Sequence, residues 1–257
     1  MLPPFGAQHW QRGLAARPFV LGHRGVRRSD VDENTLTAFE RARCEGAAGV
    51  ELDVRLDGSG NLVVIHDATL QRVSGSGDTR RIDRMSSGEL SRIRLRHGER
   101  IPTFADALAW SAEHQQRLNI ELKHDVPDRQ LLLSRVAAAV ARVPDAPERV
   151  VLSSFDPRLV LGLRWRLPEV ARAWLLHDQQ RWLKRGAGSG WLGAVGLHPQ
   201  FTLLTPEAFT RYRRRALFLG TWTVNAPARV RALTRLGIDT LISDTPGAVL
   251  ATLAAMD

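Results

Sequence analysis

The feature that most constrains the fold is a regular alternation of short apolar runs with amphipathic segments along the 257 residues. Short apolar runs bounded by turn residues indicate buried strands, and apolar residues spaced three or four apart indicate helices. The chain divides into eight strand–helix units, with one short extra strand after the second. The predicted strands are residues 19–23, 49–53, 61–66, 118–123, 149–154, 170–176, 192–197, 216–224 and 239–243. The predicted helices are residues 36–45, 103–114, 129–141, 180–184, 227–236 and 246–254, together with helices opening at 156–157 and after 206.

Strands that alternate with helices pair in parallel through right-handed crossovers. Eight units in about 250 residues predict an α/β fold, a closed (β/α)8 TIM barrel, with a doubly wound open sheet as the alternative. The single cysteine, Cys44, excludes an internal disulfide and a multi-cysteine metal site. We expect one domain over residues 1–257, with a core at about 19–255 and a small insertion at about 67–100 after the second strand.

The net charge of the chain does not identify a binding partner. Lysine and arginine number 36 against 27 acidic residues, a formal charge of +9. Such a charge suits nucleic acid, an anionic membrane or a phosphate-bearing substrate. The arginines are spread along the chain without a basic tail, so a solvated coat is the better interpretation and no nucleic acid is expected. No signal peptide and no membrane-spanning run is visible, which predicts a soluble cytoplasmic protein. Peripheral membrane contact and oligomeric state stay open.

In a (β/α)8 barrel the active site lies at the carboxyl ends of the strands. The polar residues of this sequence collect at those positions. They are His23, Arg24, Glu51, Asp53, Glu121, Lys123, Ser153, Ser154, His198, Trp222, Asn225 and Asp244.

Glu51 and Asp53 are separated by one residue, so both carboxylates point to the same face of a strand. Glu121 adds a third from a neighbouring strand. Buried like charges raise one another's pKa, and a hard divalent cation such as Mg²⁺ or Ca²⁺ removes that conflict. The alternative is that these carboxylates pair with the plentiful arginines.

Two histidines, His23 and His66, are candidates for acid–base work near neutral pH. Arg24 and a glycine follow His23, which places a fixed cation and an accessible backbone where a phosphate could bind. Lys123 stands out because 34 of the 36 basic residues are arginine. A compact ammonium fits beside carboxylates or a phosphate where a guanidinium would not. Trp222 is either a barrel-core aromatic or an apolar wall for a substrate alcohol. The other histidines receive a structural interpretation, among them His97, His114, His124, His177 and His9.

These residues resemble the glycerophosphodiester phosphodiesterase family, in its compact cytoplasmic bacterial form. The matching segments occur in the family's order and cover most of the chain. They are residues 22–25 (GHRG), 33–35 (ENT), 49–54 (GVELDV), 62–67 (LVVIHD), 101–103 (IPT), 119–123 (NIELK), 153–156 (SSFD), 222–225 (WTVN) and 244–246 (DTP). The departures are Gly22, where alanine is common, and Val73, where threonine is frequent; neither position has an assigned catalytic role.

The resemblance implies a TIM barrel that hydrolyses glycerophosphodiesters to sn-glycerol 3-phosphate and an alcohol, a small-molecule reaction. It assigns the ligation of one divalent metal, Mg²⁺ or Ca²⁺, to Glu51, Asp53 and Glu121. It assigns acid–base roles to His23 and His66. The glycerol 2-hydroxyl can attack phosphorus to give a cyclic glycerol phosphate, or a metal-activated water can attack directly; both routes stay open.

The resemblance also assigns phosphate contact to Arg24 and Lys123. Trp222 is a candidate for substrate contact, and Glu33 and Asn225 are supporting residues near the site.

Two other functions compete with this interpretation. One is a phospholipase D-like, lysophospholipase D-like or phosphoinositide phospholipase C type enzyme acting on membrane lipid. Such an enzyme needs an exposed apolar rim, for which Trp182 and Trp191 are candidates. The other is a non-enzymatic nucleic-acid-binding protein, which would leave the three carboxylates unexplained.

Overall fold

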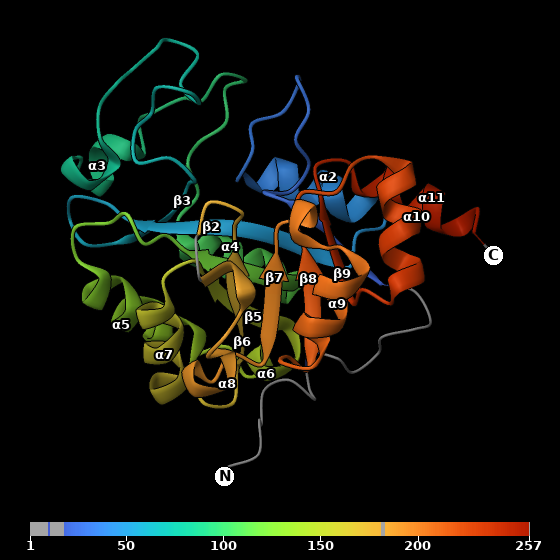
Figure 1. Cartoon of the computed structure of the whole chain (residues 1–257). Helices are drawn as coiled ribbons and strands as arrows, with labels where there is room; N and C mark the ends of the chain where they lie inside the picture. The colour runs from blue at the N-terminus through green and yellow to red at the C-terminus, as the bar shows by residue number, and fades with distance from the viewer. Residues whose placement is uncertain (1–9, 11–17, 181–182, 257) are drawn as a thin grey trace.

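The computed structural model describes residue 10, residues 18–180 and residues 183–256. Within this part of the chain, eight parallel strands close into a barrel with helices outside it, as Figure 1 shows. The pairing of β1 with both β2 and β9 closes the ring, which confirms the (β/α)8 barrel and excludes the open sheet. In order around the barrel the strands are β1 (Phe19–His23), β2 (Gly49–Leu56), β4 (Arg117–Leu122), β5 (Val150–Ser154), β6 (Ala171–Leu176), β7 (Gly196–Pro199), β8 (Phe218–Thr221) and β9 (Thr240–Ser243). The extra strand, β3 (Leu62–Val64), pairs antiparallel with β2.

The helices begin where the sequence supplies caps. The Thr35 hydroxyl accepts from the Ala38 amide at the start of α2, and Asp156 caps α7, which opens with a proline. None of the helices in the described ranges is long and apolar enough to span a membrane. The α-helices are α2 (Leu36–Cys44), α3 (Ser87–Leu90), α4 (Phe104–Glu113), α5 (Arg129–Val140), α6 (Ala146–Arg149), α7 (Pro157–Arg166), α8 (Ser189–Leu192), α9 (Pro206–Arg213), α10 (Pro227–Leu236) and α11 (Pro246–Ala254). The 3₁₀ turns are η1 (Ile82–Arg84), η2 (Leu183–Arg185) and η3 (Phe201–Leu203).

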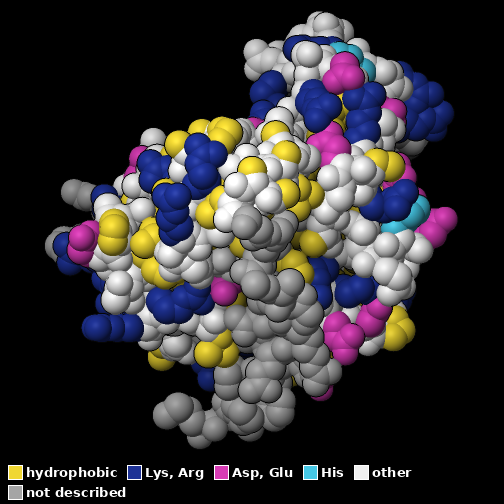
Figure 2. Space-filling model, turned by 90° about the vertical axis from the view of Figure 1, so that its right-hand side faces the viewer, with side chains coloured by type: hydrophobic (Ala, Val, Ile, Leu, Met, Phe, Trp, Pro, Cys, Tyr) yellow, Lys and Arg dark blue, Asp and Glu magenta, His cyan; other side chains and the backbone are white. Residues whose placement is uncertain are grey.

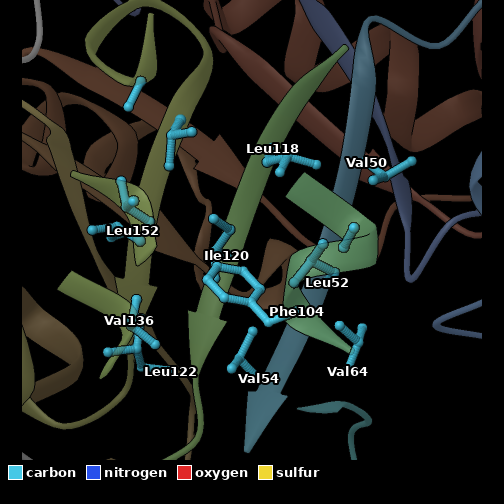
Figure 3. Close-up of a cluster of buried hydrophobic side chains, with 14 of the residues drawn as sticks. Val50, Leu52, Val54, Val64, Phe104, Leu118, Ile120, Leu122, Val136 and Leu152 are labelled. Atoms are coloured by element: carbon cyan, nitrogen blue, oxygen red, sulfur yellow. The ribbon is translucent and has the colours of Figure 1, made fainter. Parts of the chain in front are cut away.

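Alternate side chains of β2 and β4 face opposite sides of the barrel wall, so the same strands contribute to the hydrophobic core and to the candidate site. Successive residues of a strand point to opposite faces. Val50, Leu52 and Val54 pack with residues of β4 and with Phe104 of α4 in the layer between sheet and helices, as Figure 3 shows. The residues between them, Glu51 and Asp53, therefore point to the barrel interior.

The seventh predicted strand is displaced in the structure. Residues 192–197 contain an apolar run, but Gly193 adopts a left-handed φ of 69° at the end of α8. The chain therefore reaches the sheet later, and β7 begins at Gly196. His198, expected after this strand, lies inside it. The strand predicted at 216–224 is likewise shorter, since β8 spans only Phe218–Thr221.

The segment at 67–100 has a small hydrophobic cluster of its own. Leu70, Ile82, Leu90 and Leu95 are buried in it, beside the turn η1 and the helix α3. Figure 1 shows this segment extending beyond the barrel near β3. From the sequence we expected only a small insertion here, because its apolar residues are sparse among Ser, Gly and Arg.

The face seen in Figure 2 carries basic side chains dispersed over the surface, with acidic side chains among them. This distribution agrees with a solvated charged coat rather than with a continuous basic stripe on that face.

Candidate active site

A cleft of about 260 Å³ opens at the carboxyl end of the barrel strands. It brings together six residues that the sequence singled out, from β1 and the turn after it, β2, the loop after β3, β4 and the loop after β8. Other residues in its lining were not singled out. The lining residues are His23, Arg24, Glu51, His66, Asn119, Glu121, Phe155, Leu175, His177, Trp222 and Ile242.

Three carboxylates meet at the floor of this cleft. Glu51, Asp53 and Glu121 each offer an oxygen within 4.8 Å of the others, and all three are buried. The register of β2 against β4 places Asp53 directly opposite Glu121. Burial, together with the neighbouring carboxylates, raises the pKa of Glu51 well above its usual range. Clustered buried oxygens of this kind fit a divalent cation such as Mg²⁺ or Ca²⁺.

Two cations, the buried Lys123 and the partly buried Arg24, offset part of this negative charge. Lys123 Nζ lies 2.8 Å from Glu121 Oε1 and 3.4 Å from Asp53 Oδ1. Burial opposes the charge on Lys123, but these carboxylates outweigh it and raise the pKa of the ammonium. Burial also opposes the charge on Asp53, yet Lys123 and Arg24 hold the pKa of that carboxyl far below its usual range. With all three carboxylates ionised, the two cations leave one negative charge uncompensated, which a metal ion would offset.

The turn after β1 fixes the position of Arg24. Arg24 itself has a left-handed φ of 56°, and Gly25 follows with a φ of 84°. A Cβ at Gly25 would lie 2.5 Å from the Ala38 carbonyl carbon, so a glycine is required there. The guanidinium consequently sits between two carboxylates, with Nε 3.2 Å from Asp53 Oδ2 and Nη1 donating to Glu33 Oε1 at 2.7 Å.

Asn34 supports Asp53 of β2. Its Nδ2 donates to Asp53 Oδ2 at 2.8 Å, and its Oδ1 accepts from the Asp53 amide at 3.2 Å. The residue has a φ of 57°, a conformation that asparagine tolerates better than most residues. The ENT motif at 33–35 therefore supplies a support for Asp53 as well as the cap of α2.

His23 is oriented by Asp244. Its Nδ1 lies 2.7 Å from Asp244 Oδ1, and its Nε2 lies 3.9 Å from Glu51 Oε2. Because an ionised carboxylate only accepts, Nδ1 carries the proton and Nε2 of the neutral ring is free to take one up. Burial lowers the pKa of His23, although Asp244 opposes the effect. Asn225 Nδ2 donates to the second oxygen of Asp244 at 2.8 Å, which places Asn225 as a support of this pair.

His66 is oriented in the same way on the other side. Its Nδ1 lies 2.6 Å from Asp67 Oδ1, and Arg72 Nε donates to the second oxygen of Asp67 at 2.6 Å. Arg72 also donates to Glu33, which Arg24 contacts as well. Burial opposes ionisation of Glu33, but Arg72 and Arg24 outweigh it and lower the pKa of Glu33 to about 2.

Sequence reasoning gave no site role to His177 or Asn119. His177 stacks on Trp222 with ring centroids 5.8 Å apart, and Phe155 meets the same indole edge-on. The signal for His177 was its position directly after β6. Asn119 is fully buried, and neither of its amide atoms has a hydrogen-bond partner. A strand-interior asparagine beside Glu51 in the register was the signal there.

His198 does not join the site, contrary to the sequence expectation. It is fully buried within β7, 5.7 Å from the Phe218 ring, and it does not line the cleft. Burial lowers its pKa to about 3, so the ring is neutral. The cause is the later start of β7, which carries His198 into the barrel core.

The Glycerophosphoryl diester phosphodiesterase family matches this chain over residues 23–248. A glycerophosphodiester phosphodiesterase of Caldanaerobacter subterraneus subsp. tengcongensis is 30% identical over 247 residues, covering 90% of this chain and 95% of the relative. The crystal structure of a putative glycerophosphoryl diester phosphodiesterase from Silicibacter pomeroyi is 25% identical with a TM-score of 0.85, covering 98% of each chain. An Oleispira antarctica phosphodiesterase, solved with the product sn-glycerol-3-phosphate, has a TM-score of 0.81 at 23% identity and covers 93% of this chain and 97% of its own.

Proposed function

The chain belongs to the glycerophosphodiester phosphodiesterase family and is a phosphoric diester hydrolase, and from that premise we propose that it hydrolyses glycerophosphodiesters to sn-glycerol 3-phosphate and an alcohol with one divalent metal ion. The observation that carries the proposal is the buried cluster of Glu51, Asp53 and Glu121 between two carboxylate-oriented histidines. The product bound to the Oleispira antarctica relative supports the same product here.

We infer that Glu51, Asp53 and Glu121 hold the metal. A bound divalent cation supplies positive charge to phosphodiester oxygens as negative charge builds up in the transition state. Arg24 and Lys123 add fixed positive charge beside it and contact the same oxygens. Asn119 offers an unpartnered amide at the floor of the cleft for a further polar contact.

His23 and His66 divide the proton transfers. His23 Nε2 takes the proton of the glycerol 2-hydroxyl. The glycerol 2-oxygen then forms a bond to phosphorus while the bond between phosphorus and the oxygen of the leaving alcohol breaks. His66 donates a proton to that leaving oxygen. Water then opens the cyclic phosphate, giving its proton to His66 while His23 returns a proton to the 2-hydroxyl. Direct attack by water on the diester is the alternative route.

The site assignment is tested with His23→Ala and Glu51→Ala, and with Glu113→Ala as a control at an exposed position outside the cleft. We expect His23→Ala and Glu51→Ala to lose sn-glycerol 3-phosphate release, and Glu113→Ala to release it at the wild-type rate. Circular dichroism should be unchanged in all three variants. Near wild-type turnover in His23→Ala or Glu51→Ala contradicts the assignment. A cyclic glycerol phosphate trapped in a single turnover supports the two-step route, and its absence favours direct attack.

Action on membrane lipid is the second candidate function, and it needs an apolar rim at the cleft. Trp191 is 72% exposed, but it lies in α8, which leads into the amino end of β7 and therefore sits at the opposite end of the barrel from the cleft. Figure 1 shows α8 below β7, whose arrowhead points upward. Trp182 lies outside the described residues. Hydrolysis of lysophospholipid in liposomes, compared with glycerophosphocholine in solution, separates the two functions.

Two expectations from the sequence stay predictions. One is the cytoplasmic location, which fractionation of the source cells tests. The other is a single domain over residues 1–257, which a single cooperative unfolding transition would support.

A further inference from the structure

A second and larger pocket, of about 440 Å³, lies beside the catalytic cleft. The loop after β1 and the segment at 67–100 form its walls. Its charged lining residues include four arginines, Arg27, Arg28, Arg72 and Arg96. None of the residues assigned above to metal ligation or to proton transfer lines it, so its role is separate from the chemical step.

Side chains that line the pocket are in direct contact with side chains that line the cleft. Glu33 lines the pocket, and its Oε1 accepts both from Arg24, which lines the cleft, and from Arg72, which lines the pocket, each at 2.7 Å. Asp244 also lines the pocket, while its carboxylate orients His23 in the cleft. A substrate bound at Glu51, Asp53 and Glu121 would therefore have to extend past these contacting pairs to reach the pocket.

In the proposed function the leaving alcohol lies on the His66 side of the cleft, because His66 protonates the leaving oxygen. His66, which protonates the leaving oxygen in the proposed function, is linked through Asp67 to Arg72. Arg72, which lines the pocket, is therefore only two side-chain contacts away from His66. On the opposite side the cleft is bounded by the aromatic pair Trp222 and His177.

The arginine donors in the lining of the pocket favour an anionic ligand. Three carboxylates line the pocket beside the four arginines, and each already has a partner. Glu33 accepts from three arginines, and Asp32 accepts from the His97 amide. Asp244 contacts His23 and Arg27. Arg96 differs from the other arginines: within the described part of the chain its guanidinium has no carboxylate at ion-pair distance, and its hydrogen bond goes to the Arg72 carbonyl at 3.4 Å. Its remaining donors are available to a ligand. No Trp, Tyr or Phe is among the described lining residues, so a choline would find no aromatic cage.

We propose that this pocket is a subsite for a second anionic group carried by the leaving alcohol, with Arg96 as the residue that determines specificity. The inference rests on the proposed hydrolysis of glycerophosphodiesters and names a substrate class for it. Arginine forks match phosphate and carboxylate oxygens, which share this chemistry. Substrates whose alcohol bears a phosphodiester or phosphate are therefore preferred over those with a neutral or cationic alcohol.

The test compares glycerophosphoglycerol with 1,3-bis(glycerophospho)glycerol, in which the same leaving glycerol carries a second phosphodiester. The ratio of kcat/KM for the second substrate to that for the first, corrected for the two equivalent bonds, is measured at fixed salt in three proteins. These are the wild type, Arg96→Gln and the control Arg92→Gln, which removes the same charge from the same segment at an exposed residue outside the pocket. Glycerophosphocholine serves as the cationic comparison.

We expect a wild-type ratio well above one, lowered about tenfold in Arg96→Gln, the loss typical of one hydrogen bond to a charged group. Arg92→Gln should keep the wild-type ratio. A wild-type ratio near one, with normal hydrolysis of glycerophosphoglycerol, overturns the subsite and leaves the proposed function standing. Equal falls in both variants overturn it in favour of a general charge effect. Hydrolysis of none of the diesters overturns the proposed function, and the subsite with it.

Discussion

Replacing Lys123 by methionine tests whether a buried ammonium balances the carboxylate cluster. Methionine keeps most of the side-chain length but has no charge. Lys123 is 7% exposed, with its Nζ 2.8 Å from Glu121 and 3.4 Å from Asp53. Removing one partner of a buried ion pair costs about 3–5 kcal/mol, because the remaining charge is left uncompensated. Arg24 still faces Asp53, so we expect a loss at the lower end, about 3 kcal/mol.

The assay is urea unfolding followed by circular dichroism at pH 7 in EDTA, so that bound metal does not contribute. The slope of the free energy of unfolding with urea should not change, since the variant buries the same surface. Lys184→Met is the matched control: it is the other lysine of the chain, its Nζ donates to the Asp178 carbonyl, and its loss should change stability by no more than about 0.5 kcal/mol. If Lys123→Met is as stable as the control, the cluster does not need this cation and the electrostatic reasoning is refuted.

Two further predictions concern the loop that supports the site. The pKa of Glu33 is lowered from 4.5 to about 2, which corresponds to about 3 kcal/mol of stability above pH 4.5. A lowered pKa means that the ionised Glu33 carboxylate is more stable in the folded than in the unfolded protein, so Glu33→Gln should be less stable than the wild type at pH 7. Urea titrations should show this difference in the free energy of unfolding shrinking as the pH falls toward 2. A difference that does not change with pH would count against the prediction. Asn34 donates to Asp53 from a left-handed φ. Asn34→Ala should therefore be less stable than Asn34→Gly by about 1 kcal/mol, which the same unfolding assay measures, and equal losses would show that backbone strain plays no part.

The barrel was predictable because its signals are local and repeated. Each strand–helix unit carries its own apolar period and caps, such as Thr35 and Asp156, and eight such units admit few topologies. The displaced β7 shows the limit of this reasoning. An apolar run around residue 193 satisfies the period of a strand, whereas the left-handed Gly193 that ends α8 is visible only in the backbone.

The site was predictable where residues lie at strand ends, as do His23, the last residue of β1, and Lys123, directly after β4. It was not predictable where partners come from far along the chain. The contact of His23 with Asp244 spans 221 positions, and Arg72 reaches Glu33 across 39. The second pocket was missed for the same reason, because the arginines that line it come from separate loops and look like a dispersed coat in the sequence.

Metal-dependent product release tests the central claim most directly. The purified protein is dialysed against EDTA, and sn-glycerol 3-phosphate release from glycerophosphoglycerol is then measured with and without added Mg²⁺ or Ca²⁺, in parallel with Glu51→Gln. Because we propose that the three buried carboxylates hold a divalent ion, we predict no release without metal, recovery on addition of one of the two ions, and no recovery in Glu51→Gln. Release at the same rate in the metal-free and metal-loaded wild type would contradict the account.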